Sequence, residues 1–405
     1  MTRHFIPPEL EHLAGEILDV DSHEMMPTKE WVPQFGEVAA ELQFAWEHNG
    51  ETNIKNMNHP YAPSYVADDQ PIGEDIWKLK GVQAPGAVLP VRREKVMDAI
   101  GVKRQIMFPT FGMASMQLAT LPLDYGYAPN ITKDRRAHGK ALLNAYNKWA
   151  IKVTQETRRV LPVTPVLADT IHELLATTRA LIDGGIRVIE LPANILPGGK
   201  SPASFELDPF WEMISANNVT VCLHVGIEHQ IFAEKGWNEA TVFEGFKVFP
   251  ELKLDPWSLT HLHLPPQNFL ATMVQGWVFE RFPDLRFGIM EYGAYWVGPL
   301  CDSMDLWYAQ GGYGLPDNPY ARLPRTPSDY VKRNVRVGVF DFEPVDKYIT
   351  QYGLEDVVCF ASDYPHVEGG RDPMGSLVQK LAPLGDHIIR KVFVDNAQWI
   401  MGDKA

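Results

Sequence analysis

The sequence is poor in cysteine. Its three cysteines, Cys222, Cys301 and Cys359, are an odd number without paired spacing, which excludes a disulfide framework. Cys222 and Cys359 lie inside apolar runs and have no polar neighbour that would lower a thiol pKa. We therefore interpret the cysteines as reduced core residues and not as catalytic thiols.

Long apolar runs and long basic runs are also missing. No stretch of about 18 apolar residues could span a bilayer, and the first residues do not resemble a signal peptide. No basic run exceeds a pair of arginines and the formal net charge is -14, which argues against nucleic acid as a partner. We expect a cytoplasmic protein that acts on a small-molecule substrate, without a membrane or nucleic-acid partner.

Apolar residues, in contrast, make up 45% of the 405 positions, enough for a sizeable core. Short apolar runs alternate with helical patterns, which is typical of βα units that form a parallel sheet. Eight such runs can be marked, at 17–22, 105–110, 160–167, 187–192, 219–225, 286–291, 335–342 and 357–362. The sequence therefore predicts an α/β fold, a distorted (β/α)8 TIM barrel with long inserted loops over its C-terminal face.

Two long connections interrupt this alternation. Residues 31–90 and 227–285 are longer than one crossover helix needs, so we predict insertions there. No internal repeat or linker is visible, which predicts a single domain over residues 1–405. Amphipathic helices are predicted over 136–157 and 171–182, and the residues after 396 predict a closing helix.

Metal-ligand residue types lie at the ends of three predicted strands. Strand alternation at the first places Asp19, Asp21 and His23 on one face. The fifth strand ends near His224, and Asp363 follows the eighth. Because the C-terminal ends of barrel strands meet on one face, Asp21, His23, His224 and Asp363 could converge on one divalent cation.

Each of these four residues also has a structural interpretation. Either aspartate could cap a turn, and either histidine could be a satisfied core residue. Four ligand-type side chains at strand ends would be costly to bury without a cation, so we favour the metal site.

Further residues are candidates for catalysis and substrate binding. Glu291, at the end of the sixth strand, could act as an acid or base, or pair with Arg336 on the next strand. His366 could position a ligand or the substrate, or be a loop histidine. His263 and Trp296 could bind substrate, with helix packing as the alternative explanation.

Weaker candidates complete this set. Glu190 ends the fourth predicted strand, and His229 lies in the loop after the fifth. Trp237, Trp257 and Phe269 are compatible with an aromatic or conjugated substrate without requiring one.

Several stretches resemble a known family. The D-x-H start, the strand-five histidine, and the segments FERFPDLRFGIMEYGAYWVGPLCDSMD, FASDYPHVEG and VDNAQWIMG are similar to the amidohydrolase-related branch of the amidohydrolase superfamily. That branch includes aminocarboxymuconate-semialdehyde decarboxylase (ACMSD), aromatic carboxylate decarboxylases, and hydrolases and hydratases of aromatic-degradation intermediates. The resemblance implies a distorted eight-stranded βα barrel, and it favours a homodimer.

The resemblance also implies one divalent metal ion, zinc first and manganese second, held by Asp21, His23, His224 and Asp363. Members of the family often carry H-x-H at the first strand, where this chain has Asp21 in place of the first histidine. The family's decarboxylases carry a histidine at the tip of the sixth strand, where this chain has Glu291. This departure argues against decarboxylation.

We therefore predict a metal-dependent hydrolase. Asp363 would take a proton from a metal-bound water that cleaves a C–N or C–C bond of a small aromatic or conjugated carboxylated substrate, with Glu291 and His366 as further catalytic residues. The alternative is a nonoxidative metal-dependent decarboxylase, a carboxy-lyase of an aromatic or enoic acid, in which Asp363 protonates the carbon. A catalytically inactive binding barrel is a third hypothesis.

Overall fold

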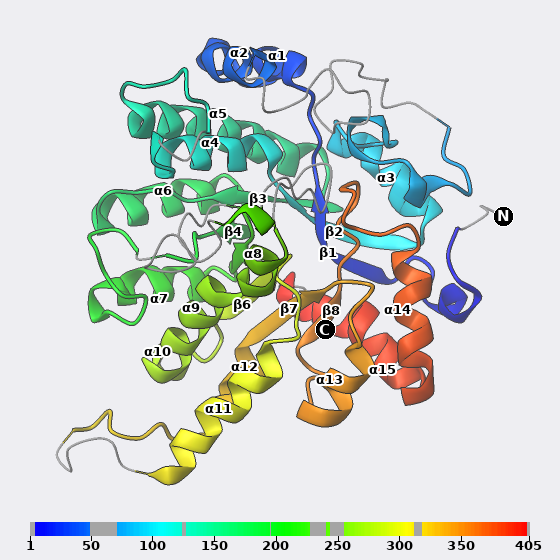
Figure 1. Ribbon diagram of the computed structural model, residues 1–405, viewed down its shortest axis with the longest axis vertical. Coiled ribbons are helices and arrows are strands. Elements are labelled where there is room, and N and C mark those ends of the chain that lie inside the picture. The colour runs from blue at the N-terminus through cyan, green and yellow to red at the C-terminus, as the bar shows by residue number, and fades with distance from the viewer. Residues whose placement is uncertain are drawn as a thin grey trace.

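The computed structural model describes residues 5–48, 71–123, 127–194, 196–226, 240–243, 255–311 and 318–402. In these ranges, parallel strands are surrounded by helices, and α11 extends away from the rest of the molecule (Figure 1). No helix of the described ranges has both the length and the apolar composition needed to cross a membrane.

Eight parallel strands follow one another around the barrel in chain order. They are β1 (Ile17–His23), β2 (Val102–Phe108), β3 (Val160–Pro165), β4 (Val188–Glu190), β5 (Thr220–His224), β6 (Arg286–Met290), β7 (Val335–Val339) and β8 (Val358–Phe360). Each coincides with a predicted strand, and its ends lie within a few residues of the prediction. The structure thus confirms the predicted α/β barrel.

Helices cover the outside and the N-terminal end of the barrel. They are α1 (Trp31–Phe35), α2 (Ala40–His48), α3 (Pro90–Ala99), α4 (Thr110–Thr120), α5 (Arg135–Glu156), α6 (Ile171–Asp183), α7 (Asp208–Ala216), α8 (Pro256–His261), α9 (Leu264–Gln275), α10 (Val278–Arg281), α11 (Val297–Gln310), α12 (Pro327–Asn334), α13 (Val345–Tyr352), α14 (Pro373–Leu381), α15 (Asp386–Arg390) and α16 (Asn396–Ile400). The predicted helices 136–157 and 171–182 are α5 and α6. Thr170 caps α6 by accepting a hydrogen bond from the Glu173 amide (3.1 Å).

The strands form because their residues are apolar and buried. Inside the barrel, one cluster joins side chains from seven strands, Leu18, Val20, Ile106, Phe108, Leu161, Val163, Val188, Cys222, Met290 and Cys359. Ala397 and Ile400 of α16 pack against the same cluster. The predicted closing helix therefore covers the N-terminal end of the barrel and leaves the C-terminal end for the polar side chains.

The barrel closes between β1 and the residues after β8. The Asp363 amide donates to the Asp21 carbonyl (2.9 Å), and the His23 amide donates to the Tyr364 carbonyl (2.8 Å). We call this junction of residues 19–23 with residues 362–364 the seam. It places three predicted site residues, Asp21, His23 and Asp363, on adjacent backbone segments.

Both predicted insertions are described in part: one reaches the region of the seam and the other forms helices. In 31–90, residues 49–70 lie outside the described ranges. The segment after them reaches the residue that follows the seam, because the Gly81 amide donates to the Pro365 carbonyl (2.8 Å). In 227–285, the described residues from 255 onward form α8, α9 and α10. The single-domain organisation stays a prediction.

Candidate metal centre

Side chains from four strand ends meet at the C-terminal end of the barrel. β1 contributes Asp21 and His23, β5 ends on His224, Glu291 follows β6, and Asp363 follows β8. All five are buried, with exposed fractions of at most 8%. The structure thus brings the four predicted metal ligands together with Glu291, which was predicted as an acid or base.

The imidazole of His23 lies at the middle of this group. Its Nε2 is 3.2 Å from Asp363 Oδ1, 3.4 Å from Asp21 Oδ1 and 3.5 Å from Glu291 Oε2. His224 Nε2 is 2.9 Å from Glu291 Oε2 and 3.7 Å from Asp21 Oδ1. Two imidazoles and three carboxylates therefore direct their polar atoms at one small volume.

His366 extends the group on one side. Its Nδ1 lies 3.1 Å from Asp363 Oδ1, and its ring stacks on that of His23 with centroids 3.7 Å apart. Two overlapping sets of four residues have ligand atoms within 4.8 Å of one another, Asp21, His23, His224 and Glu291, and His23, Glu291, Asp363 and His366. His23 and Glu291 belong to both sets.

The donor atoms of this group fit a divalent cation. Several buried atoms face one another without a hydrogen bond to any described residue, namely Asp21 Oδ1, His23 Nε2, His224 Nε2, Glu291 Oε2 and both carboxylate oxygens of Asp363. His224 Nδ1 lies 2.9 Å from the Val225 carbonyl, which assigns the ring proton to Nδ1 and leaves the Nε2 lone pair for a ligand bond. Imidazole nitrogens with carboxylate oxygens suit zinc or manganese.

Opposite charges stabilise one another in the group. Burial opposes a charge on His23 and on His224, but the nearby carboxylates outweigh it and raise both pKa values well above 6.5. Burial likewise opposes ionisation of Glu291, but His224 and His23 lower its pKa to about 2. For Asp21 and Asp363 the histidines also outweigh burial and lower the pKa below 3.8. Protons and a cation would therefore compete for the same atoms.

Two of the carboxylates sit on unusual backbone. Glu291 has a φ of 59° and Asp363 a φ of 51°, in the left-handed region that residues other than glycine seldom adopt. The Glu343 carboxylate supports the exits of β6 and β7 by accepting from the Ala294 amide (2.9 Å) and the Phe340 amide (2.8 Å). Such conformations persist where surrounding contacts hold them, and they gather at functional sites.

The predicted alternation of β1 is wrong at Asp19. The pairing of β1 with β2 is irregular between Asp19 and Ser22, and Asp19 belongs to neither ligand set. Its carboxylate accepts from Gln105 Nε2 (2.8 Å), the Ser362 amide (2.9 Å) and Ser362 Oγ (2.6 Å). Burial nevertheless raises its pKa to about 7.

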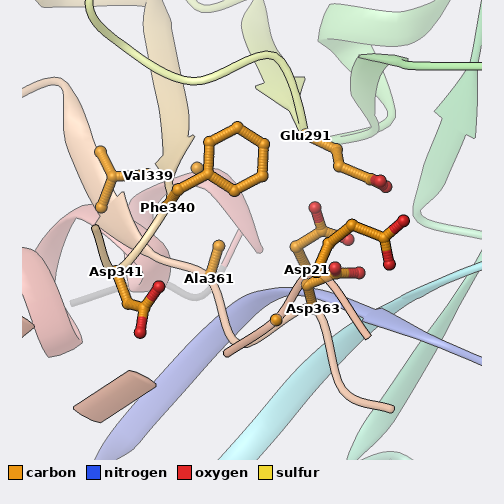
Figure 2. Close-up of a pocket in the computed structure, with 10 residues that line it drawn as sticks. Asp21, Glu291, Val339, Phe340, Asp341, Ala361 and Asp363 are labelled. Carbon is orange, nitrogen blue, oxygen red and sulfur yellow. The ribbon is translucent and has the colours of Figure 1, made fainter. Parts of the chain in front are cut away.

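Beside the ligand group, a pocket opens at the ends of β6, β7 and β8 (Figure 2). It is lined by Asp21, Glu291, Gly338, Val339, Phe340, Asp341, Ala361, Asp363, Glu368 and Gly369. Figure 2 shows Asp21, Glu291 and Asp363 together on one side, with Asp341 apart from them. The Phe340 ring, Val339 and Ala361 supply an apolar wall next to the carboxylates.

The structure does not support the alternative in which Glu291 pairs with Arg336. The Arg336 guanidinium lies over the Trp399 ring at 4.2 Å and donates to the Val335 carbonyl (2.8 Å). Glu190 is buried at the end of β4 but belongs to neither ligand set. Of the carboxylates predicted at strand ends, Asp21, Glu291 and Asp363 thus share the centre.

The predicted substrate-binding residues lie elsewhere on this end of the molecule. His263 Nδ1 is 2.9 Å from Tyr295 Oη, and the His263 ring is 6.0 Å from that of Trp296. Trp296 is buried and donates through Nε1 to the Gly293 carbonyl (2.9 Å). Neither residue lines the pocket of Figure 2, and their role in substrate binding stays a prediction.

The structure describes two of the weaker aromatic candidates, Phe269 and Trp257. Phe269 is a core residue that packs against Phe287, with ring centroids 5.8 Å apart. Trp257 lies in α8 against the ring of His261. His229 and Trp237 lie outside the described residues.

Glu24 is a buried carboxylate that the sequence analysis missed. Its Oε1 accepts from the amides of Thr110 (2.8 Å) and Phe111 (3.0 Å), and its Oε2 accepts from the Met26 amide (2.9 Å). It therefore fixes the exit of β1 to the start of α4. Its place directly after His23, before two methionines, was a usable signal for a buried structural carboxylate.

The chain matches one family of known proteins and several solved structures. Residues 123–400 match the model of a family described as Amidohydrolase. No curated protein matches the sequence at a significant level.

Solved structures share the fold over nearly the whole chain. An amidohydrolase from Mycobacterium avium subsp. paratuberculosis K-10 is 18% identical with a TM-score of 0.61, over 95% of this chain and 99% of that one. A 5-carboxyvanillate decarboxylase from Novosphingobium aromaticivorans, complexed with manganese and 4-hydroxy-3-methoxy-5-nitrobenzoic acid, is 16% identical with a TM-score of 0.56, over 99% of both chains. A 2,6-dihydroxybenzoate decarboxylase from Rhizobium is 13% identical with a TM-score of 0.55, over 95% and 98%.

Proposed function

Since the chain belongs to the amidohydrolase family, we propose that it is a metal-dependent carboxy-lyase that removes a carboxylate nonoxidatively from a small aromatic or enoic acid. The observation that carries the proposal is the buried group of Asp21, His23, His224 and Glu291, whose ligand atoms lie within 4.8 Å of one another. Two of the similar folds are decarboxylases of aromatic acids, one of them with manganese bound, which supports this reaction over the hydrolysis expected first.

Asp21, His23, His224 and Glu291 would hold one divalent cation, with Asp363 beside His23 as a further ligand. When bound, such an ion supplies Lewis-acid chemistry to an oxygen of the substrate. Three carboxylates among the donors favour a harder ion than a site of histidines and cysteines would, so manganese ranks beside zinc.

Proton transfer and the apolar surroundings of the site would come from other residues of the chain. Asp363 would deliver a proton to the carbon that loses its carboxylate, as the bond between the two carbons breaks. His366 and His23 lower the pKa of Asp363 below 3.8, and His366 Nδ1, 3.1 Å away, is placed to supply the proton. Val339, Phe340 and Ala361 form an apolar wall beside the ligand group.

Hydrolysis is the second candidate, and Glu291 is the observation that favours it. A carboxylate at the tip of β6 can accept a proton from a water molecule, as Asp363 can from the other side of His23. Such a hydrolase would cleave a C–N or C–C bond of its substrate with water and would not release carbon dioxide.

The test is to load the protein with manganese or zinc and to incubate it with benzoic acids that carry a hydroxyl beside the carboxylate. Carbon dioxide release is followed together with the decarboxylated product. We expect carbon dioxide to be released over many turnovers per protein molecule. Absence of release from the whole panel, with cleavage of amide or C–C bonds in matched aromatic substrates, would establish hydrolysis instead.

The matched variant for this test is Asp363→Asn, which keeps the shape of the side chain and removes its proton transfer. We expect turnover to fall by about 100-fold or more while the fold persists by circular dichroism. A variant that is active at the original rate would show that another group transfers the proton.

A further inference from the structure

A fully buried arginine lies against the seam. Arg93, in the first turns of α3, is 1% exposed. Its Nη2 donates to the His23 carbonyl (2.6 Å), its Nε to the Gly86 carbonyl (2.7 Å) and its Nη1 to the Tyr364 carbonyl (3.4 Å). The guanidinium also lies over the Tyr364 ring, at 4.8 Å from its centroid.

Two of these acceptors adjoin the proposed metal ligands. His23 is itself in both ligand sets, and Tyr364 follows Asp363 directly. The Tyr364 carbonyl also accepts from the His23 amide (2.8 Å). One guanidinium therefore bridges the backbone that carries His23 and the backbone that carries Asp363.

The seam is where such a bridge has most effect. The ladders that join β1 to β2 and β7 to β8 continue over several residues, whereas β1 and the residues after β8 share one short parallel bridge at Ser22 and Tyr364. A guanidinium is planar, and its donors have fixed directions, so it sets the spacing of the carbonyls that it binds. The ammonium of a lysine is a point charge that cannot reproduce this fork.

The segment before α3 strengthens the connection. A Cβ added to Gly86 would lie 2.8 Å from the Arg93 Cα, so glycine allows the chain to pass this close. The Tyr364 hydroxyl donates to the Pro85 carbonyl (2.8 Å). The described end of the first predicted insertion is thus joined to the seam by two side chains. Arg93 binds the Gly86 and Tyr364 carbonyls, and Tyr364 binds the Pro85 carbonyl.

We propose that Arg93 is a positioning residue that sets the distance between the His23 and Asp363 side chains, and through it the affinity and coordination geometry of the metal centre. The inference rests on the proposed function, because it requires that these side chains bind a cation. Among the described residues, Arg93 contacts the backbone of His23 and Tyr364 and does not line the pocket of Figure 2, so its effect on the ligand side chains passes through the backbone.

The experiment titrates Co²⁺ alone into the unsubstituted protein, Arg93→Met, Arg93→Lys and Arg92→Met. Affinity is read from the visible absorption of bound Co²⁺, whose band positions report coordination geometry, and folding from circular dichroism. Arg92 is the matched control, because it precedes Arg93 in α3 and is exposed.

We expect Arg93→Met to bind Co²⁺ about 10- to 100-fold more weakly, as for other groups that orient ligands, and to shift the absorption bands. Arg93→Lys should lie between it and the unsubstituted protein, and Arg92→Met should match the unsubstituted protein. A folded Arg93→Met variant with unchanged affinity and bands would overturn the inference. So would loss of the fold in both Arg93 variants, because Arg93 would then serve folding alone.

The same titration separates the two proposals. If the unsubstituted protein and Arg92→Met take up no Co²⁺, the metal centre of the proposed function fails, and the role of Arg93 fails with it. If both bind Co²⁺ and Arg93→Met binds it equally well, only the role of Arg93 fails.

Discussion

At the scale of single residues, the centre of this protein is a balance of charges. Burial would make each ionised side chain costly, yet the histidines lower the pKa of the carboxylates and the carboxylates raise that of the histidines. A cation would take the place of the histidine protons. Metal binding and proton release are then one equilibrium.

This equilibrium predicts that Mn²⁺ binds more tightly as the pH rises. His23 and His224 have pKa values raised well above 6.5, so near neutral pH they must each lose a proton before they bind the ion. The carboxylates are already ionised there, because their pKa values are lowered. Affinity should rise up to about tenfold per pH unit for each proton displaced.

Calorimetric titration with Mn²⁺ between mildly acidic and alkaline pH measures this slope, and buffers of different ionisation enthalpy count the protons released. Affinity that does not change with pH would contradict this prediction, because no proton would then be displaced from the histidines.

Residue types at strand ends were sufficient to predict which side chains converge. Asp21, His23, His224 and Asp363 meet as their positions at the ends of β1, β5 and β8 indicated. The place of Glu291 inside both ligand sets was not predicted; its side chain reaches the centre from a left-handed backbone, as that of Asp363 does. No local pattern in the sequence specifies such a conformation for glutamate.

At the scale of elements, the seam is the junction of the barrel with the shortest strand ladder, a single bridge between Ser22 and Tyr364. Asp19 reinforces it from outside the ligand group by accepting two hydrogen bonds from Ser362 and one from Gln105. The β1 carboxylate thereby ties the exit of β8 to β1 and β2.

Removing the Ser362 hydroxyl tests this contribution. Ser362→Ala deletes the 2.6 Å hydrogen bond to Asp19 Oδ2, and Ser362 is buried. We expect the free energy of unfolding, measured by urea denaturation, to fall by about 1–3 kcal/mol. Thr350→Ala, at an exposed position of α13, should change it by less than about 0.5 kcal/mol. Equal values for the two variants would show that the Asp19 hydrogen bond does not stabilise the seam.

The elements themselves were predictable because apolar runs and amphipathic periods are local. The irregularity of β1 between Asp19 and Ser22 was not, since it arises where β1 pairs with β2 on one side and with the residues after β8 on the other. Contacts between distant parts of the chain also explain why Arg93 was not recognised as a support of the site.

At the scale of the whole molecule, the two ends of the barrel differ: apolar packing lies at one and the candidate site at the other. Its N-terminal end is closed by α16 over an apolar interior, and its C-terminal end carries the ligand group and the pocket. This division is general for (β/α)8 barrels, in which residues at the C-terminal ends of strands carry the reaction. The reaction itself was not predictable from the fold, because long connections and strand exits decide the substrate. The homodimer and the cytoplasmic location stay predictions.

The central claim is that side chains of β1 and β5, with those that follow β6 and β8, hold one divalent ion. Equilibrium dialysis against Mn²⁺ or Zn²⁺, followed by elemental analysis of the protein, tests it most directly. The account predicts one tightly held ion per chain. Less than about a tenth of an equivalent of either metal would contradict it and favour an inactive binding barrel, since a closed site with these ligands should bind tightly.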